Sequence, residues 1–457
     1  MISHTGATRA TVTDYVPFPY RSISIRIIPF LTLGFLAAYI DRVNVGFAKL
    51  QMAHDLHMSD SSFGLAAGLF FIGYVLCEIP SSLILARVGA RRWLSRILIS
   101  WGILSMLGGL VTNEAEFLVS RIALGVAEAG FMPGALFMLA EWIPGARRSR
   151  AVAAFMFGIP AASIVGAPLS GLILTHLSGF HGLSGWRWLF ILEGLPPVCL
   201  GLWGWLALPD SLSSAAWLTP EARQAAHEIL ANEASQQEPD AGAVAAFRNP
   251  AIWLIGAIDG TILLGLYTIA FWLPSFLKER LHDAPGISFS MVGLMVAIPH
   301  IVGALAMLLV GWSADRQQER RWHLFLPLLA GGIALALYAM PLHGVTWLLV
   351  TASCANAGLL SGLPSLWALP SGFLKGHAAA TGLATACSFA NLAGFVATSF
   401  LGVAIVHFGG AQFVIWIFAL TAILGGASVF LLPVPNRTVQ AKSRCDDGPG
   451  HPSEILS

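Results

Sequence analysis

The chain has 457 residues, of which 56% are hydrophobic and only 11% are charged, and its mean hydropathy is +0.73. Soluble proteins carry roughly 25% charged residues, so the composition excludes an ordinary soluble protein and predicts one embedded in a lipid bilayer. The net charge of +1 excludes the strongly basic surface with which proteins usually bind nucleic acid, and we expect no nucleic-acid partner.

Twelve stretches of mainly apolar residues follow one another along the chain. About 20 such residues are needed to cross ~30 Å of hydrocarbon as a helix, so these stretches predict an all-α membrane protein with twelve transmembrane helices. Their expected bounds are residues 25–45, 62–86, 92–111, 117–141, 150–177, 187–208, 251–277, 288–312, 322–341, 346–370, 377–407 and 412–432.

A polar stretch divides the twelve helices into two sets of six. It begins with Pro209 and Asp210 and contains the sequence TPEAR, which is typical of the start of a short amphipathic helix. The last residues lack apolar periodicity and predict a disordered tail. The expected organisation is a cytoplasmic segment at 1–24, a six-helix bundle at 25–208, a cytoplasmic linker at 209–250, a second six-helix bundle at 251–432 and a cytoplasmic tail at 433–457.

Lysine and arginine are distributed unevenly between the two sides of the expected membrane. Of these 25 residues, nineteen lie on the side of the termini and the linker and five on the other side, and Arg121 falls inside a helix. Cytoplasmic loops carry the excess, so we expect a protein of the inner membrane with both termini in the cytoplasm. No apolar run precedes position 27, and we expect no cleavable signal peptide.

Five cysteines are scattered without the CxxC spacing of redox or zinc sites. Four of them lie in apolar stretches, where cysteine behaves as a small hydrophobic residue. We therefore expect no disulfide, no metal site and no bound cofactor. The cysteines are Cys77, Cys199, Cys354, Cys387 and Cys445.

One short motif follows the second expected helix of each half. Residues 87–93 read RVGARRW and residues 316–322 read RQQERRW, so both contain Arg, three residues and then Arg-Arg-Trp. A single basic loop would reflect topology alone, whereas recurrence at the same place favours two pseudo-symmetric six-helix bundles. Repeats of this kind are typical of transporters that bind substrate between the repeats, near the bilayer midplane.

Two charged residues lie inside the fourth expected helix. Arg121 and Glu128 are seven residues apart, which places them on one helix face. An ionisable side chain at the membrane centre costs ~2.5–3.5 kcal/mol on insertion scales, so it is kept where it pairs or lines a wet cavity. Glu128 is either a proton carrier, because an apolar site favours the neutral carboxyl, or a permanent ion-pair partner of Arg121.

Asp41 and Arg42 end the apolar run of the first expected helix. One interpretation is an arginine that extends to the membrane boundary with its counterion beside it. The other is an anion site, because a guanidinium presents a planar fork that binds a carboxylate through two hydrogen bonds and stays charged at any working pH.

Several sequence strings occur in a characteristic order along nearly the whole chain. They are DRVN at 41–44, CEIPSS at 77–82, RIALGVAEAGFMPG at 121–134, GWRWLFILEGLP at 185–196, FWLPSFLK at 271–278, GWSADR at 311–316 and NLAGF at 391–395. In these strings the chain resembles the major facilitator superfamily and, within it, the anion:cation symporter family of phthalate, tartrate and sugar-acid permeases. It departs from the family pattern at Ser82, Met138, Asp259 and His300, which bear on the substrate more than on the fold.

The resemblance implies a monomeric secondary active transporter that imports a small organic carboxylate with protons by alternating access. Its partners would be the organic anion, protons and the lipid bilayer, with the proton as coupling ion. By this resemblance Arg42 binds the substrate carboxylate, and Asp41 and Glu128 take part in proton coupling.

Further residues match positions that line the central cavity of the sugar-acid permeases, and packing is the alternative role of each. The residues expected to bind substrate are Arg42, Tyr74, Arg121, Ser365, Trp367 and Asn391. Asp259 and His300 are expected to determine specificity, with hydrogen bonds between helices as their alternative role.

Charged residues on the linker side are expected to gate the cavity as ion pairs that break when the two halves rock. Basic loops that only set the topology are the alternative. The expected pairs join Glu78 with Arg87, Arg91 and Arg92, and Asp315 with Arg316.

Two other classes of function compete with import. A membrane enzyme is disfavoured because HExxH, GxSxG and P-loop motifs are missing from the sequence, and we expect no enzyme. The alternative among transporters is a proton-coupled antiporter that exports amphipathic compounds. The string GIPAASIVGAPLSG resembles the Gly-Pro antiporter motif only loosely, because Ala167 stands where that motif has glycine.

Overall fold

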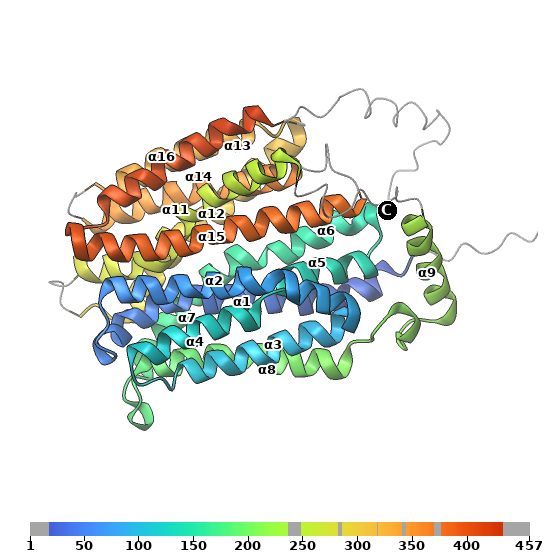
Figure 1. The fold of residues 1–457 in the computed structure, drawn as a ribbon, viewed down its shortest axis with the longest axis horizontal. Helices are drawn as coiled ribbons and strands as arrows, with labels where there is room; N and C mark the ends of the chain where they lie inside the picture. The colour runs from blue at the N-terminus through green and yellow to red at the C-terminus, as the bar shows by residue number, and fades with distance from the viewer. Residues whose placement is uncertain are drawn as a thin grey trace, which may run out of the picture.

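The computed structural model describes residues 18–235, 248–281, 286–317, 319–340, 344–369 and 376–432. Within these ranges every regular element is a helix, and the long helices lie side by side in one direction of the molecule (Figure 1). The all-α fold expected from the sequence is confirmed.

The N-terminal half contains six membrane-length spans, two of which are interrupted. The fourth span consists of α4 and α5, and the fifth consists of α6 and α7. The helices of this half are α1 (Tyr20–Asp55), α2 (Asp60–Val88), α3 (Ala90–Gly108), α4 (Glu114–Glu128), α5 (Phe131–Trp142), α6 (Gly145–Met156), α7 (Gly158–His176) and α8 (Gly185–Ala207).

The C-terminal half contains six spans, each a single helix. They are α11 (Pro250–Arg280), α12 (Phe289–Gln317), α13 (Trp322–Tyr338), α14 (Val345–Ala368), α15 (Gly376–Phe408) and α16 (Gln412–Ser428).

The expected short linker helix is α9 (Pro220–Ser235). Its Glu233 accepts hydrogen bonds from the backbone N–H of Gly145 through both carboxylate oxygens, at 3.1 and 3.0 Å. These bonds hold α9 against the first residues of α6.

Ten of the described spans are long and apolar enough to cross a membrane. The other two are α13, which has 17 residues, and α3, which has 19 and begins with several arginines. Large apolar side chains cover the outside of the bundle, where Leu76, Leu206 and Leu309 are 70%, 82% and 68% exposed. Because such side chains are favourable in lipid and costly in water, this surface faces the bilayer. The structure confirms a membrane fold of twelve spans.

Small residues allow the helices of each half to pack closely. A Cβ atom at Gly125 of α4 would overlap the carbonyl oxygen of Phe70 in α2, and Gly102 of α3 lies against Gly194 of α8. In the C-terminal half, Gly358 of α14 packs directly on the backbone of α13. Glycine is therefore needed wherever these helix backbones approach.

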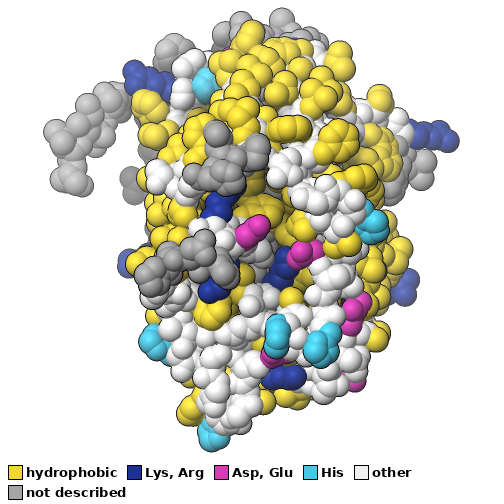
Figure 2. Space-filling view, turned by 90° about the vertical axis from the view of Figure 1, so that its left-hand side faces the viewer, with side chains coloured by type: hydrophobic (Ala, Val, Ile, Leu, Met, Phe, Trp, Pro, Cys, Tyr) yellow, Lys and Arg dark blue, Asp and Glu magenta, His cyan; other side chains and the backbone are white. Residues whose placement is uncertain are grey.

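The two ends of the bundle differ. The linker end carries α9 and the start of α1, and the opposite end, which we call the distal end, carries the turns at residues 56–59, 177–184 and 409–411 (Figure 1). Figure 2 looks onto the distal end and shows charged side chains and histidines on this face, with apolar side chains along its flanks.

The two halves meet closely near the distal end. A Cβ atom at Gly46 of α1 would lie only 2.7 Å from the carbonyl oxygen of Phe271 in α11. On the other side of the bundle, the Ser290 hydroxyl of α12 bonds to the Thr175 hydroxyl of α7 at 2.9 Å. The halves are thus closed against each other at this end.

One buried cation also joins the halves near the distal end. Lys49 of α1 is 9% exposed, and its Nζ lies 2.5 Å from a carboxylate oxygen of Asp60. The same Nζ lies 4.1 Å from the ring centroid of Trp272 in α11, which is a cation–π contact across the interface.

Candidate functional site

A buried ion pair occupies the centre of the N-terminal half. Arg42 of α1 donates from Nε and from NH2 to Oε1 of Glu128 in α4, at 3.0 and 2.5 Å, and the two residues are 5% and 1% exposed. The guanidinium also lies 4.9 to 5.3 Å from the ring centroids of Tyr39, Phe70 and Tyr74. One carboxylate and three aromatic faces therefore compensate the buried cation.

The structure decides against two of the alternatives raised by the sequence. Helix α1 does not end near Arg42 but continues to Asp55, so Arg42 is not an arginine that reaches the membrane boundary. The hydrogen-bonded partner of Glu128 is Arg42 and not Arg121. Spacing along one helix gives the face that a residue occupies, but it does not identify the neighbouring helix that supplies its partner.

The helix that carries Glu128 is interrupted directly after it. Ala129 is extended, with ψ 132°, and Gly130 has φ +89°, a left-handed conformation that favours glycine. Ser81 of α2 donates to the carbonyl of Ala129 at 2.7 Å and accepts from the Trp93 indole at 3.0 Å. A neighbouring helix thus satisfies a carbonyl that the break would leave unpaired, as membrane-embedded backbone requires.

A second buried network surrounds Asp41, which is 1% exposed. Its Oδ1 accepts hydrogen bonds from the Ser105 hydroxyl of α3 and, at 3.5 Å, from the Asn44 amide. Asn44 also donates to Glu193 of α8 at 2.8 Å, and the Ser170 hydroxyl of α7 donates to the other oxygen of Glu193 at 3.0 Å. The network connects two carboxyl groups through one amide and involves four helices.

Arg121 is 2% exposed, and none of its guanidinium nitrogens has a hydrogen-bond partner among the described residues. It interacts electrostatically with Asp41 and with Glu128, and it lies 5.1 Å from the ring centroid of Phe70. A small cavity beside it, lined partly by Ser105, has room for about one water molecule. Arg121 thus supplies positive charge near two carboxyl groups without holding either by a hydrogen bond.

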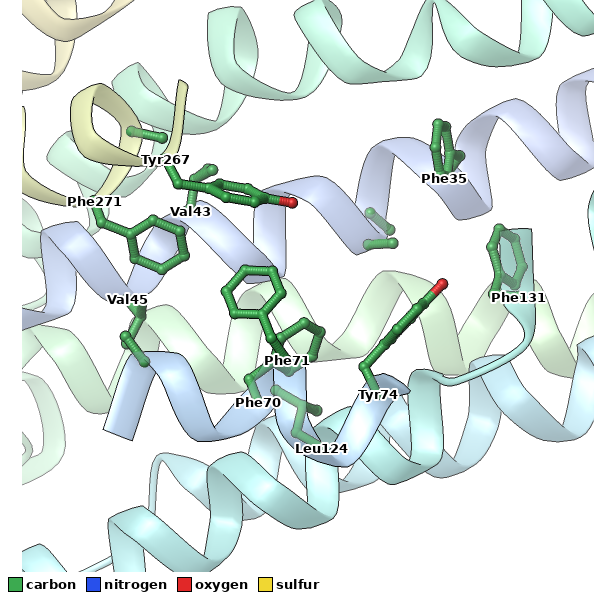
Figure 3. Close-up of a cluster of buried hydrophobic side chains, with 14 of the residues drawn as sticks. Phe35, Val43, Val45, Phe70, Phe71, Tyr74, Leu124, Phe131, Tyr267 and Phe271 are labelled. Carbon is green, nitrogen blue, oxygen red and sulfur yellow. The ribbon is translucent and has the colours of Figure 1, made fainter. Parts of the chain in front are cut away.

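The C-terminal half reaches this centre through Tyr267 of α11. Its ring lies 4.9 Å, centroid to centroid, from that of Phe71 in α2, and its hydroxyl interacts electrostatically with Arg42. Figure 3 shows the Tyr267 ring among apolar side chains of α1 and α2, including Val43. The buried centre therefore lies at the interface of the two halves.

The remaining predicted cavity residues lie on several helices. Tyr74 of α2 is 2% exposed and lies beside Arg42, as described above. Ser365 of α14 is fully buried, and its hydroxyl has no partner within the described ranges. Trp367 of α14 and Asn391 of α15 are half-buried. Only Tyr74 joins the Arg42 centre directly.

His300 of α12 is 8% exposed and forms a hydrogen bond with the Asn356 amide of α14 at 3.3 Å. The same amide donates to the carbonyl of Pro299 at 2.9 Å. Of the two roles considered for His300, a hydrogen bond between helices is therefore the one that the contacts show. The described residues contain no group of three or more His, Cys, Asp or Glu side chains that could hold a metal ion.

Comparison with known proteins assigns this arrangement to a family. The family model described as Major Facilitator Superfamily matches residues 31–398. The chain belongs to the Major Facilitator Superfamily. Members and relatives are membrane transporters, not enzymes.

Three relatives can be aligned with most of the length of this facilitator. The protein NicT of Pseudomonas putida, assigned to metabolite transport, is 43% identical over 91% of this chain and 94% of its own. A protein of Agrobacterium vitis assigned to tartrate transport is 38% identical, over 84% and 87% of the two chains. A quinolone resistance transporter of Acinetobacter baumannii is 37% identical over the same shares.

Solved structures show the same fold. The inward open conformation of the xylose transporter XylE from Escherichia coli superimposes with a TM-score of 0.70, over 91% of this chain and 97% of that one. The sequence identity is 16%, so this similarity concerns the architecture of the facilitator and not its substrate.

The expected gating pairs of this facilitator need correction. Glu78 accepts a hydrogen bond from the Ser388 hydroxyl of α15, in the other half. Arg91 and Arg92 instead face Asp210 at the start of the linker, with nitrogen–oxygen distances of 2.8 and 3.5 Å. These pairs could not be predicted from the sequence, because Asp210 approaches Arg91 and Arg92 only when α8 packs along α3.

The other gating residues also have different surroundings from those expected. Arg87 is exposed at the end of α2. Asp315 pairs with Arg320 at 2.5 Å, and Arg316 instead lies over the ring of Trp312, 5.5 Å from its centroid. The pair expected between Asp315 and Arg316 is thus replaced by one that joins the last turn of α12 to the loop after it.

The repeated basic motif has the same structural role in both halves. Arg91 donates to the carbonyl of Leu208, directly after α8, at 2.9 Å. Arg321 donates to the carbonyl of Leu432, shortly after α16. Each basic loop is therefore bonded to the end of the sixth span of its own half, which supports the pseudo-symmetry inferred from the repeat.

Sequence reasoning assigned no role to several residues of the buried centre, among them Asn44, Tyr39, Ser105 and Tyr267. Asn44 lies within the DRVN string, which was noted without a role for the amide. Tyr39, Ser105 and Tyr267 are single polar residues in apolar helices, and no spacing pattern distinguishes them from packing residues.

Proposed function

We propose that this transporter imports a small organic carboxylate together with protons. The observation that carries the proposal is the buried pair of Arg42 and Glu128, because it unites an anion-binding guanidinium with a carboxyl that can take up a proton. Relatives assigned to metabolite and tartrate transport support an organic acid as substrate. A sugar acid, a tartrate-like acid or an aromatic acid would each fit a guanidinium anchor.

Competition for Arg42 would couple the proton to the substrate. While Glu128 is ionised, its Oε1 accepts the hydrogen bonds from Nε and NH2 of Arg42. When Glu128 takes up a proton, its attraction for the guanidinium falls, and Arg42 can bind a substrate carboxylate instead. Loss of the proton restores the ion pair and displaces the substrate. Protonation of Glu128 therefore raises the affinity for the substrate, and bound substrate raises the proton affinity of Glu128 by the same factor.

Asp41 is the second proposed proton site. It lies in the hydrogen-bonded network of Ser105 and Asn44 and near the uncompensated charge of Arg121. Because Arg121 interacts with both Asp41 and Glu128, it would stabilise whichever of the two carboxyl groups is ionised. A proton could then pass between these groups without leaving a net charge unbalanced.

The direction of access follows from the closed distal end. We place the linker end in the cytoplasm of a cell with this protein in its inner membrane, because lysine and arginine concentrate there. Both termini are then cytoplasmic, and the described state is closed toward the outside. Rocking of the halves would open the distal end by separating Gly46 from Phe271. We propose a monomer that uses the proton as its coupling ion and needs no other cofactor.

A second candidate function is proton-coupled export of amphipathic compounds. The observation that favours it is the relative that confers quinolone resistance. An exporter would exchange its substrate for protons, so an inward proton gradient would empty the cytoplasmic side of substrate instead of filling it.

Transport by purified protein in liposomes tests the proposal. Labelled sugar acids, tartrate and aromatic acids are offered outside, with and without a proton gradient directed inward. We expect at least one acid to accumulate only when the gradient is present. Gradient-driven loss of preloaded acid would favour the exporter, and transport of none of these acids in either direction would contradict a carboxylate function.

A further inference from the structure

One buried acidic group in the C-terminal half has no role in the proposed exchange. Asp259 lies on α11, where Ile255, Ile258 and Ile262 are each no more than 1% exposed. Asp259 itself is 5% exposed, and among the described residues it forms no hydrogen bond and no ion pair. An ionised carboxylate in such surroundings is costly unless a partner compensates it.

The Asp259 carboxyl lies within electrostatic range of residues from both halves. It interacts electrostatically with Tyr39 of α1, with Tyr267 on its own helix and with Cys387 of α15. Tyr39 belongs to the N-terminal half and the other two residues to the C-terminal half. The carboxyl therefore acts on residues of both halves, across the interface between them.

The same two tyrosines also lie beside Arg42. The Arg42 guanidinium is 5.0 Å from the ring centroid of Tyr39 and interacts electrostatically with Tyr267. Asp259 and Tyr267 are eight positions apart, which corresponds to ~12 Å along a helix, and Arg42 is paired with Glu128 and not with Asp259. Tyr39 and Tyr267 are thus within electrostatic range of both the Asp259 carboxyl and the Arg42 guanidinium, which belong to opposite halves.

Among the residues that the structure describes, the buried cationic side chains near this interface do not compensate Asp259. Lys49 is paired with Asp60 near the distal end, and Arg42 is paired with Glu128. His300 of α12, in the same half as Asp259, is bonded to Asn356. A cationic group on the substrate would therefore supply the partner that Asp259 lacks.

We propose that the substrate is zwitterionic, a small carboxylate that also carries a protonated nitrogen. Its carboxylate binds Arg42, its nitrogen donates to the Asp259 carboxylate, and its apolar or aromatic body lies between Tyr39 and Tyr267. This assignment rests on the proposed carboxylate function and narrows its substrate class. It also explains why an acidic side chain is kept in a site whose main anchor is an arginine.

A matched pair of ligands tests the assignment with the wild-type chain alone. Both para-aminomethylbenzoate and para-methylbenzoate carry one carboxylate on one ring, and only the first carries a cationic nitrogen. Binding to the purified full-length protein is measured by tryptophan fluorescence at neutral pH. We expect the aminomethyl acid to bind about tenfold more tightly or better, because its ammonium would form a charge-assisted hydrogen bond with a carboxylate that otherwise stays buried without a partner.

A substitution then assigns the preference to one residue. Asp259→Asn removes the charge but keeps the shape, and we expect it to abolish the preference for the aminomethyl acid while leaving para-methylbenzoate affinity within about twofold. Glu141→Gln is the matched control, because it removes an acidic charge from an exposed position on α5, and it should keep the wild-type preference. The thermal midpoint of each variant shows that it is folded.

The outcomes separate this assignment from the function on which it rests. Equal affinity of the two acids for the wild type, or a preference that survives Asp259→Asn, would overturn the zwitterion assignment and leave the carboxylate function intact. If neither these acids nor the sugar acids and tartrate bind, the carboxylate function itself fails and the assignment with it.

Discussion

The two halves of the molecule share one architecture but contain different buried chemistry. The N-terminal half buries Arg42, Arg121, Asp41, Glu128 and Glu193 near its centre, and all of these except Arg121 take part in hydrogen bonds or an ion pair. The C-terminal half buries one isolated carboxyl, Asp259, together with neutral polar groups such as Asn356 and Ser365. Under the proposed function, this difference assigns charge coupling to the first half and substrate discrimination to the second.

The sharpest test of this comparison is removal of the central cation. Arg42→Ala should raise the dissociation constant of transported carboxylates by about 100-fold or more, because it removes the anchor and leaves Glu128 buried without its partner. Arg42→Lys should recover only part of the affinity, since an ammonium lacks the planar fork. Arg21→Ala, at an exposed position near the start of α1, is the control. Unchanged affinity in Arg42→Ala would show that another residue binds the substrate carboxylate.

The next largest effect concerns coupling. Glu128→Gln cannot exchange a proton, so it should still exchange labelled for unlabelled substrate across liposomes but should lose gradient-driven accumulation entirely. Initial exchange rates and steady-state accumulation are measured on the same vesicles. A Glu128→Gln protein that still concentrates substrate would show that the coupling proton is carried outside this ion pair.

An intermediate effect is expected where the halves close. Gly46→Leu places a side chain against the carbonyl of Phe271 and should keep the distal end open. A cysteine introduced at Thr175 should then react several-fold faster with a membrane-impermeant maleimide. Gly344→Leu lies near the same end, where an added Cβ meets nothing within 4 Å, and serves as control. Equal labelling in the two variants would mean that Gly46 is not part of the closure.

The smallest effect distinguishes the two copies of the repeated motif. Glu319 accepts hydrogen bonds from the backbone N–H groups of Arg321 and Trp322 at the start of α13, where the N-terminal motif has Ala90. Partial burial raises the pKa of Glu319, but the hydrogen bonds from Trp322 and His323 outweigh it, so that the pKa is lower than usual. Glu319→Gln should lower stability by ~1 kcal/mol, as loss of a helix cap does.

The pH dependence of that effect has a definite sign. A carboxyl with a lowered pKa in the folded state stabilises the fold above its unfolded pKa of about 4.3, and this contribution disappears as the pH falls through the folded value. The thermal midpoints of wild type and Glu319→Gln should therefore differ at neutral pH and converge in acid. A difference that grows in acid would contradict this account.

Most spans could be predicted closely because the apolar runs that form them are long and continuous, although α1 continues to Asp55, past its expected end at residue 45. The expected helix at 251–277, for example, corresponds to α11 at Pro250–Arg280. The break between α4 and α5 was not predicted, because glycine and proline are common in transmembrane helices without interrupting them. The break depends on a contact with another helix, because Gly130 packs against Ser81 of α2, whose hydroxyl bonds to the carbonyl of Ala129.

The site could be predicted in its residues but not in its pairs. Arg42, Glu128 and Asp41 were expected because ionisable groups are rare in apolar helices. Their partners come from other helices, so the bond from Arg42 to Glu128 and the one from Ser388 to Glu78 depend on packing that one-dimensional spacing does not contain. The roles of these residues in binding and coupling remain predictions for the experiments above.

The bonds at the start of the linker have a mechanical consequence. Arg91 holds both the carbonyl of Leu208 and the carboxylate of Asp210, so the linker leaves the first bundle from a fixed point. Tension along the linker would therefore be borne at this anchor and would not unwind the last turn of α8. A chain severed within residues 236–247 should therefore still hold the start of its linker against the first bundle.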